Sequence, residues 1–144
     1  MADYTRLMGL DIGKKRIGIA LSDPLKITSQ GFETYLRQSA EKDIEHYNKI
    51  IKDYNVEKII IGLPKTLSGD IGIAAEDIIK YCDNIKESLL APIVMYDERM
   101  SSAHAHRIFD EGNIRHKKRR NSIDMMAAAI ILGDYMKGET WKDK

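Results

Sequence analysis

The chain has 144 residues, a formal net charge of +1 and a hydrophobic content of 43%. This length suits one domain of about 100–200 residues, so we expect a single domain over residues 1–144, with a core over about residues 6–136 and a flexible tail. The composition excludes collagen-like and disordered proteins, no apolar stretch suits a membrane span or an export signal, and the lone Cys82 is compatible with a reducing, cytoplasmic environment.

Two apolar, β-branched runs open the chain at residues 7–12 and 17–22. The polar residues 13–16 between them are typical of a hairpin turn. A third strand is expected around residues 32–36. The chain is therefore predicted to begin as an antiparallel meander of three strands.

The next part of the chain alternates helices and strands. Ser39 can cap a helix that reaches Tyr54, and a strand is expected to follow at residues 56–62. A second helix, with an apolar stripe over residues 75–89, precedes a strand at residues 92–96. This alternation predicts a right-handed crossover and parallel pairing of the later strands.

The last third is expected to contain two helices. A short helix is predicted over about residues 101–112, and a basic loop follows at residues 115–120. Asn121 or Ser122 then caps a final helix. Its body, residues 125–136, is apolar nearly all round, as expected for a helix that packs closely on a sheet.

The small net charge conceals a basic segment. Residues 104–120 contain six lysines or arginines and two acids, a net charge of +4. Such a segment suits a polyanion, whose affinity would fall as the salt concentration rises, although a solvated loop is the alternative interpretation. His104 and His106 lie two residues apart, so they point to different faces of a helix and make a poor metal-binding pair.

Three acids stand where expected elements begin or end: Asp11, Glu98 and Asp124. Hydrolysis of a phosphodiester by two metal ions about 3.5–4 Å apart needs hard oxygen ligands on rigid elements, which carboxylates supply. If the fold brings these acids together, they form a metal site. Each also has a structural interpretation, because Asp11 can shape a turn, Glu98 can pair with Arg99, and Asp124 suits the first turn of a helix.

Four blocks of sequence, in this order, form a recognisable pattern. They are Asp11-Ile12-Gly13-Lys14-Lys15-Arg16-Ile17-Gly18-Ile19-Ala20-Leu21-Ser22-Asp23, Gly62-Leu63-Pro64-Lys65, Asp97-Glu98-Arg99-Met100-Ser101-Ser102, and Lys118-Arg119-Arg120 through Asp124 to Ala127-Ala128-Ala129-Ile130-Ile131-Leu132. The pattern resembles the YqgF family, the pre-16S ribosomal RNA nucleases also called Holliday-junction-resolvase-like proteins. The resemblance covers roughly residues 6–136, and four ordered blocks are far more specific than any one of them.

The resemblance implies an α/β, ribonuclease-H-like fold, in which a mixed five-stranded sheet opens as an antiparallel meander, continues with parallel strands and is flanked by helices. It also implies that Asp11, Glu98 and Asp124 are the catalytic, metal-binding acids of a nuclease that uses Mg²⁺ (or Mn²⁺). The expected role is maturation of the 5′ end of 16S ribosomal RNA in the bacterial cytoplasm. Residues 68–74 depart from the family's usual loop, in which a glutamine stands where this chain has Ala74, and this puts substrate contacts by that loop in doubt.

The expected nucleic-acid contacts are basic residues beside the acids and in the basic segment. They are Lys14, Lys15, Arg16, Arg99, Lys117, Lys118, Arg119 and Arg120. A charged hairpin tip and an ion pair between Glu98 and Arg99 are the plainer interpretations of the first four. Aromatic residues are few and fall mainly on apolar faces, which argues against a base-stacking platform.

Three other functions compete with the RNA nuclease. A resolvase would use the same acids on a four-way DNA junction and would need a dimer to make paired cuts. A nucleic-acid-binding factor would use the basic segment while the acids served no purpose. An actin-like ATPase is a weaker candidate, because the chain is too short for two lobes. The expected partners are pre-16S ribosomal RNA, alone or within the ribosomal particle, with no membrane, and the expected state is a monomer or a weak homodimer.

Overall fold

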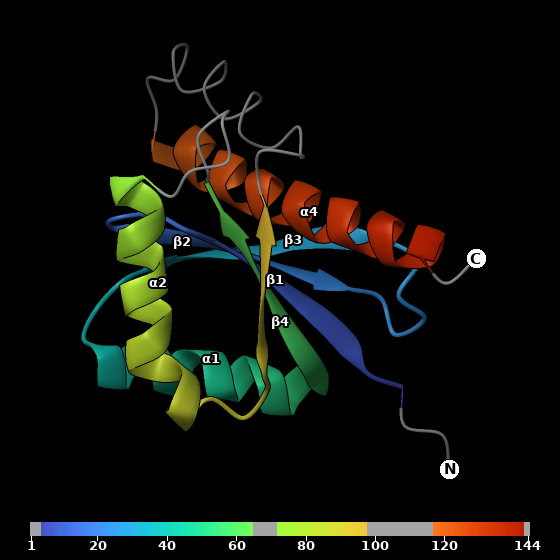
Figure 1. Ribbon diagram of the computed structural model, residues 1–144, viewed down its shortest axis with the longest axis horizontal. Helices are drawn as coiled ribbons and strands as arrows, with labels where there is room; N and C mark the ends of the chain where they lie inside the picture. Colours follow the sequence, from blue (N-terminus) through green and yellow to red (C-terminus); the bar gives the residue numbers. More distant parts are fainter. Residues whose placement is uncertain (1–3, 65–71, 98–116, 143–144) are drawn as a thin grey trace.

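The computed structural model describes residues 4–64, 72–97 and 117–142, with side chains over residues 4–64, 72–97 and 122–138. Figure 1 shows a five-stranded sheet with helices on both faces. The strands, in chain order, are β1 (Arg6–Ile12), β2 (Arg16–Ser22), β3 (Ser29–Leu36), β4 (Val56–Leu63) and β5 (Ile93–Asp97). No helix in the described ranges is long and apolar enough to cross a membrane.

The sheet order is β3-β2-β1-β4-β5. β1 pairs with β2, and β2 with β3, in antiparallel directions, whereas β1–β4 and β4–β5 are parallel. This order and these directions confirm the predicted ribonuclease-H-like arrangement. The carboxyl ends of β1, β4 and β5 consequently lie at one end of the sheet.

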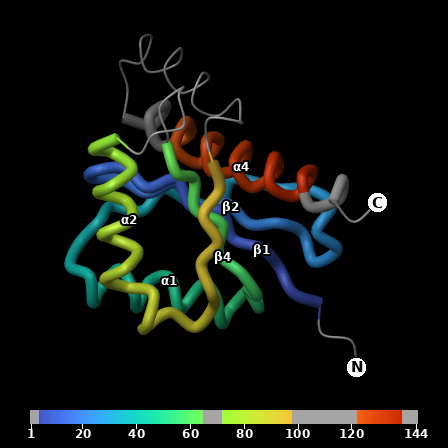
Figure 2. Tube along the Cα trace, in the orientation of Figure 1, coloured from blue at the N-terminus to red at the C-terminus, as the bar shows by residue number. Residues whose placement is uncertain are grey.

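Two helices cover one face of the sheet, and a third covers the other (Figures 1 and 2). The first face carries α1 (Ala40–Tyr54) and α2 (Ile73–Ile85), followed by the short 3₁₀ helix η1 (Lys86–Ser88), and the second carries α4 (Lys117–Lys142). Ser39 caps α1 as predicted, since its side chain accepts a hydrogen bond from the Lys42 backbone N–H.

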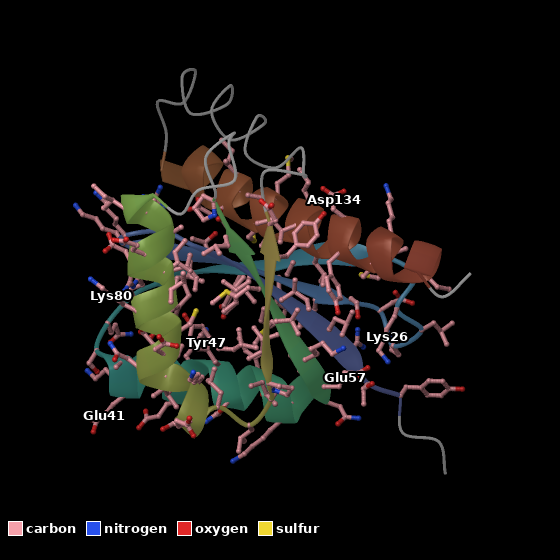
Figure 3. The ribbon with its side chains drawn as sticks, in the orientation of Figure 1. Lys26, Glu41, Tyr47, Glu57, Lys80 and Asp134 are labelled. Carbon is pink, nitrogen blue, oxygen red and sulfur yellow. The ribbon has the colours of Figure 1, made fainter. Side chains whose placement is uncertain are left out.

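Alternation along β1 explains why the sheet buries both faces. Met8 and Leu10 belong to the larger core beneath α1 and α2, whereas Leu7 belongs to the smaller core beneath α4. In the larger core, Tyr47 of α1 is fully buried and lies between the helices and the sheet (Figure 3). Successive residues of a strand face opposite sides, so odd-numbered residues of β1 face α4.

Helix α4 lies unusually close to the sheet because glycines face it. A Cβ added at Gly9 would lie 2.8 Å from the Leu132 Cβ, and one at Gly31 would lie 2.9 Å from the Met125 Cβ. Both distances are shorter than the 3.0 Å that real Cβ atoms keep. The Ser29 hydroxyl adds a hydrogen bond to the Ala129 carbonyl oxygen. Strands β1, β2 and β3 therefore present a surface with few protruding side chains, on which this helix packs closely.

The elements differ from the sequence prediction chiefly at the start of β3 and at the two ends of α4. β3 begins at Ser29, three residues before the predicted start at position 32. The predicted loop at residues 115–120 is wrong over residues 117–120, and so is the cap at Asn121 or Ser122, because α4 begins at Lys117. Lysine and arginine are good helix formers, and a single Asn or Ser is a weak start signal where a helix anchored by packing can extend past it.

The same helix continues past residue 136 to Lys142, through the stretch for which the sequence predicts a flexible tail. Gly138 is thus a helical residue, with no atom within 4 Å of a Cβ placed there. The short helix predicted over residues 101–112 lies outside the described residues.

Candidate active site at the carboxyl end of the sheet

Two of the three predicted acids are buried in the structure. Asp11 is 3% exposed and Asp124 is 1% exposed. Ionised carboxylates are almost never fully buried unless a partner or a metal compensates the loss of solvation. Both carboxylates therefore need compensating partners. The geometry around them shows how the fold places them together.

Asp11 lies on β1 and faces α4. In the antiparallel ladder it stands directly opposite Gly18 of β2. Side chains of directly opposed residues share one face of the sheet, so the missing side chain at Gly18 leaves space beside the Asp11 carboxylate. Helix α4 occupies that space.

Asp124 fills the space above Gly18. A Cβ at Gly18 would overlap the Asp124 backbone oxygen and would lie only 3.2 Å from the Asp124 Cα. Since opposed Cβ positions in a ladder are about 4.5–5.5 Å apart, the Asp11 Cβ and the Asp124 Cα are separated by no more than about 9 Å. The fold thus brings together two acids that are 113 positions apart in the chain.

Arg16 pairs with Asp124. Its guanidinium Nε donates a hydrogen bond to the Asp124 Oδ2 at 2.7 Å, and the two side chains are 27% and 2% exposed. Arg16 is the first residue of β2 and follows the hairpin tip directly. The sequence favours a phosphate contact for this residue, with compensation of a carboxylate charge as the alternative, and in the structure its side chain lies on the Asp124 carboxylate.

The hairpin tip exposes two of the predicted basic contacts. Lys14 and Lys15 are both exposed. The tip is held by Arg37, which follows β3: its Nη1 donates to the Gly13 carbonyl oxygen at 2.8 Å, and its backbone N–H donates to the Lys15 carbonyl oxygen at 2.9 Å. The Arg37 guanidinium also lies 4.3 Å from the centre of the Tyr81 ring. Sequence patterns do not identify Arg37, whose only signal is its position just after a strand that pairs with the hairpin.

A third buried acid, Asp43 of α1, is not among the predicted site residues. Its carboxylate accepts hydrogen bonds from the hydroxyls of Tyr35 and Tyr81, at 2.8 and 2.7 Å, and from the Gln38 backbone N–H at 2.9 Å. Burial, together with the hydrogen bond to Asp43, raises the pKa of Tyr35 to about 12. This network ties β3 to α1 and α2 in the larger core, on the face opposite α4, so we assign it a structural role.

The remaining predicted site residues lie at or beyond the limits of the described structure. Glu98 and Arg99 are outside the described residues, and Glu98 follows Asp97, the last residue of β5. Asp97 pairs with Leu63 of β4, at the end of the sheet to which β1 also leads. Within the described residues, no group of three or more His, Cys, Asp or Glu side chains could hold a metal ion.

The four basic residues 117–120 form the first turn of α4, where only their backbone is described. Figure 1 shows that α4 begins near the end of the sheet to which β4 and β5 point. The backbone therefore places residues 117–120 at the same end of the molecule as Asp124.

Known proteins match nearly the whole chain. Residues 5–138 match the family described as "RuvX: Holliday junction resolvase". A Clostridium novyi protein described as "Putative pre-16S rRNA nuclease" is 45% identical over 131 residues, which cover 91% of this chain and 97% of that protein. A Desulforamulus reducens protein with the same description is 42% identical, with 91% and 96% covered.

Solved structures also resemble the chain, at lower identity. Thermus thermophilus RuvC in complex with a Holliday junction substrate has 12% identity and a TM-score of 0.48, with 94% of this chain and 96% of that chain covered. The fowlpox virus Holliday junction resolvase has 17% identity and a TM-score of 0.48, with 93% and 99% covered. From the match over residues 5–138 and the relatives above 40% identity, the chain belongs to the RuvX family of nucleases, hydrolases that act on phosphodiester bonds.

Proposed function

We propose that the chain is a divalent-metal-dependent endonuclease that cleaves structured RNA, and that its substrate is the 5′ precursor segment of 16S ribosomal RNA. The observation that carries the proposal is the approach of Asp124 to Asp11 across Gly18, which gathers two buried carboxylates at one end of the sheet. The names of the relatives, which describe pre-16S rRNA nucleases, support the choice of RNA.

The donor set fits a hard divalent cation. Carboxylate oxygens are the ligands that Mg²⁺ and Mn²⁺ prefer, and the glycine at position 18 leaves room for α4 to present Asp124 beside Asp11. Asp11 and Asp124, with Glu98 as the third predicted ligand, would hold the ion. When bound, the ion supplies a nucleophile from water at neutral pH and stabilises charge that develops on the phosphate.

The protein's own cations bind and orient the substrate. Lys14 and Lys15 project from the hairpin tip that follows Asp11, and phosphate contacts there would place the backbone of the RNA beside the acids. Arg99 and the four basic residues 117–120 extend this set. Their contribution is electrostatic and independent of sequence, so recognition of the cleavage site rests on RNA shape or on the ribosomal particle.

A DNA junction is the second candidate substrate, because the matching family carries the description of a Holliday junction resolvase. Paired cuts in a four-way junction need two active sites, and thus two copies of this chain. A single cut in RNA needs only one active site. Substrate choice and oligomeric state are therefore tested together.

The proposed function is tested by cleavage of a labelled 16S precursor RNA, beside a labelled four-way DNA junction, in Mg²⁺, in Mn²⁺ and in chelator. Asp11→Asn is the inactivating variant. Asp53→Asn, which removes an exposed acid from α1, is the matched control. We expect RNA cleavage that requires metal, survives in the control and is lost in Asp11→Asn. Cleavage of the junction alone would identify DNA, and not RNA, as the substrate. Full activity of Asp11→Asn would refute the carboxylate mechanism.

A further inference from the structure

The pairing of Arg16 with Asp124 compensates the negative charge of a buried carboxylate. Asp124 is 2% exposed at its side chain, and Arg16 donates to its Oδ2 at 2.7 Å. A guanidinium is a permanent cation that compensates a buried carboxylate when a strong hydrogen bond joins the two. Asp124 therefore has a positive partner within the protein itself.

A divalent ion changes this balance. An ion bound to the Asp124 carboxylate needs an oxygen lone pair and brings two positive charges to within a few ångströms of the guanidinium. Like charges at such separations repel each other, and solvent screens this repulsion less in a partly buried site than at the surface. Arg16 and the ion thus compete for the same carboxylate.

The Arg16 side chain can also reach solvent. Its side chain is 27% exposed, and its backbone begins β2 immediately after Lys14 and Lys15, which face solvent. The tip itself is held in place by Arg37. Rotation of the Arg16 side chain alone, with no movement of the strand, would carry the guanidinium from Asp124 into the solvent to which Lys14 and Lys15 are also exposed.

We propose that Arg16 is a positioning residue that holds Asp124 in the ion-free protein and passes to a phosphate of the nucleic acid when the ion binds. This inference rests on the proposed function, since it assumes that Asp124 is an ion ligand. Its consequence is thermodynamic coupling. The ion frees a cation for the nucleic acid, and the nucleic acid removes a competitor of the ion, so each must raise the affinity for the other by the same factor.

The first test is binding of Mn²⁺ alone, with free Mn²⁺ measured by electron paramagnetic resonance, in the absence of nucleic acid. Arg16→Met keeps an unbranched apolar stem and removes the charge. Lys52→Met removes an exposed charge from α1, and Lys80→Met removes a charge from the outer side of α2 (Figure 3). We expect Arg16→Met to bind Mn²⁺ at least about 5-fold more tightly than the unaltered chain, the lower end of typical coupling factors, and both controls to change by less than about twofold.

Arg16→Lys covers the case in which Arg16→Met does not fold. A lysine retains the charge but not the planar group that donates from Nε, so its Mn²⁺ affinity is expected to lie between those of the unaltered chain and Arg16→Met. Equal or weaker Mn²⁺ binding by the Arg16 variants that fold would overturn the proposal, because the guanidinium would then not compete with the ion.

The second test measures coupling directly. A labelled RNA hairpin is titrated with protein in Ca²⁺ and in chelator, and gels verify that the RNA stays intact. We expect Ca²⁺ to strengthen RNA binding in the unaltered chain, and this factor to fall several-fold in Arg16→Met. The same factor in both proteins would refute the transfer of Arg16 to phosphate.

The two proposals fail in different ways. Loss of metal-dependent cleavage in Asp11→Asn, together with unchanged Mn²⁺ affinity in Arg16→Met, would retain the nuclease and reject the role of Arg16. Absence of Mn²⁺ binding in every protein would reject both the metal site and the exchange. Tighter Mn²⁺ binding in Arg16→Met, with cleavage of neither nucleic acid, would retain the exchange at Asp124 and reject the proposed substrates.

Discussion

The Asp124 backbone oxygen occupies the place that a Cβ would take at Gly18. This contact lets α4 lie directly on the β1–β2 hairpin and sets Asp124 beside Asp11, the cross-strand partner of Gly18. The overlap involves backbone atoms, which cannot rotate away as a flexible side chain can. The glycine is therefore required by the approach of the helix, and the approach of the helix builds the site.

Gly18→Ala is expected to destabilise the fold strongly. The new methyl group forces α4 away from the sheet, and overpacking of this kind costs about 1–3 kcal/mol or more. Gly138→Ala is the control: that residue is helical with no atom within 4 Å of the new Cβ, so the change is expected to stabilise the helix by about 0.5–1 kcal/mol. Urea unfolding measures both, and equal stability of Gly18→Ala and the unaltered chain would contradict the close approach.

Divalent ions are expected to stabilise the folded chain. An ion that binds only the folded state at a concentration 100 times its dissociation constant adds about 2.7 kcal/mol to the free energy of unfolding. Thermal melts in saturating Mg²⁺ should therefore show a rise of several degrees over melts in chelator. Asp11→Asn and Asp124→Asn are expected to lose most of this rise, whereas Asp53→Asn keeps it. Identical melts with and without Mg²⁺ would count against an ion site.

The folded chain is expected to lose stability in alkali, starting near pH 10. Burial first, and then interactions that include Asp43, raise the pKa of Tyr35 to about 12, and the pKa values of Tyr47 and Tyr81 also lie above the ordinary value of 10. Since these groups are neutral when protonated, the unfolded chain loses their protons first as pH rises past 10, and this loss favours unfolding.

This stabilisation should be complete below pH 10 and fall as pH rises towards 12 and above. Tyr81→Phe removes one titrating hydroxyl and is expected to flatten the alkaline decline. At neutral pH it should cost about 1–3 kcal/mol, because Asp43 is left with one hydrogen bond fewer in a buried position. Urea unfolding from pH 7 to pH 11 measures both effects, and an unchanged decline in Tyr81→Phe would show that the network does not titrate with unfolding.

Replacement of the four basic residues 117–120 by alanine is expected to weaken nucleic-acid binding and flatten its dependence on salt. Removal of one cation from a phosphate should lower the slope of log K against log salt by about 0.7–0.9. Alanine favours helix, so the start of α4 is retained. Lys52→Ala and Lys80→Ala, exposed on α1 and α2, serve as controls on the face opposite α4. If the fourfold variant keeps the slope of log K against log salt of the unaltered chain, the binding surface lies elsewhere.

Local patterns explain how much of the fold could be predicted. The hairpin of β1 and β2, the Ser39 cap and the alternation from β4 to β5 are encoded by residues that are neighbours in sequence or lie a few positions apart. The start of α4 differs from its prediction because local signals are weak there. Asn121 and Ser122 have the local character of a cap, but helix propensity over residues 117–120 and the packing of the helix on the sheet outweigh it.

Sequence patterns are enough to locate each strand, to single out the three acids and, through the four ordered blocks, to recognise the family. The packing of distant segments is needed to show that Gly18 makes room for Asp124 and that Arg16 pairs with an acid 108 positions away. The same packing reveals that Arg37 holds the hairpin tip. The physical reason is that periodicity and capping are local, whereas excluded volume and charge pairing depend on which segments the sheet order brings together.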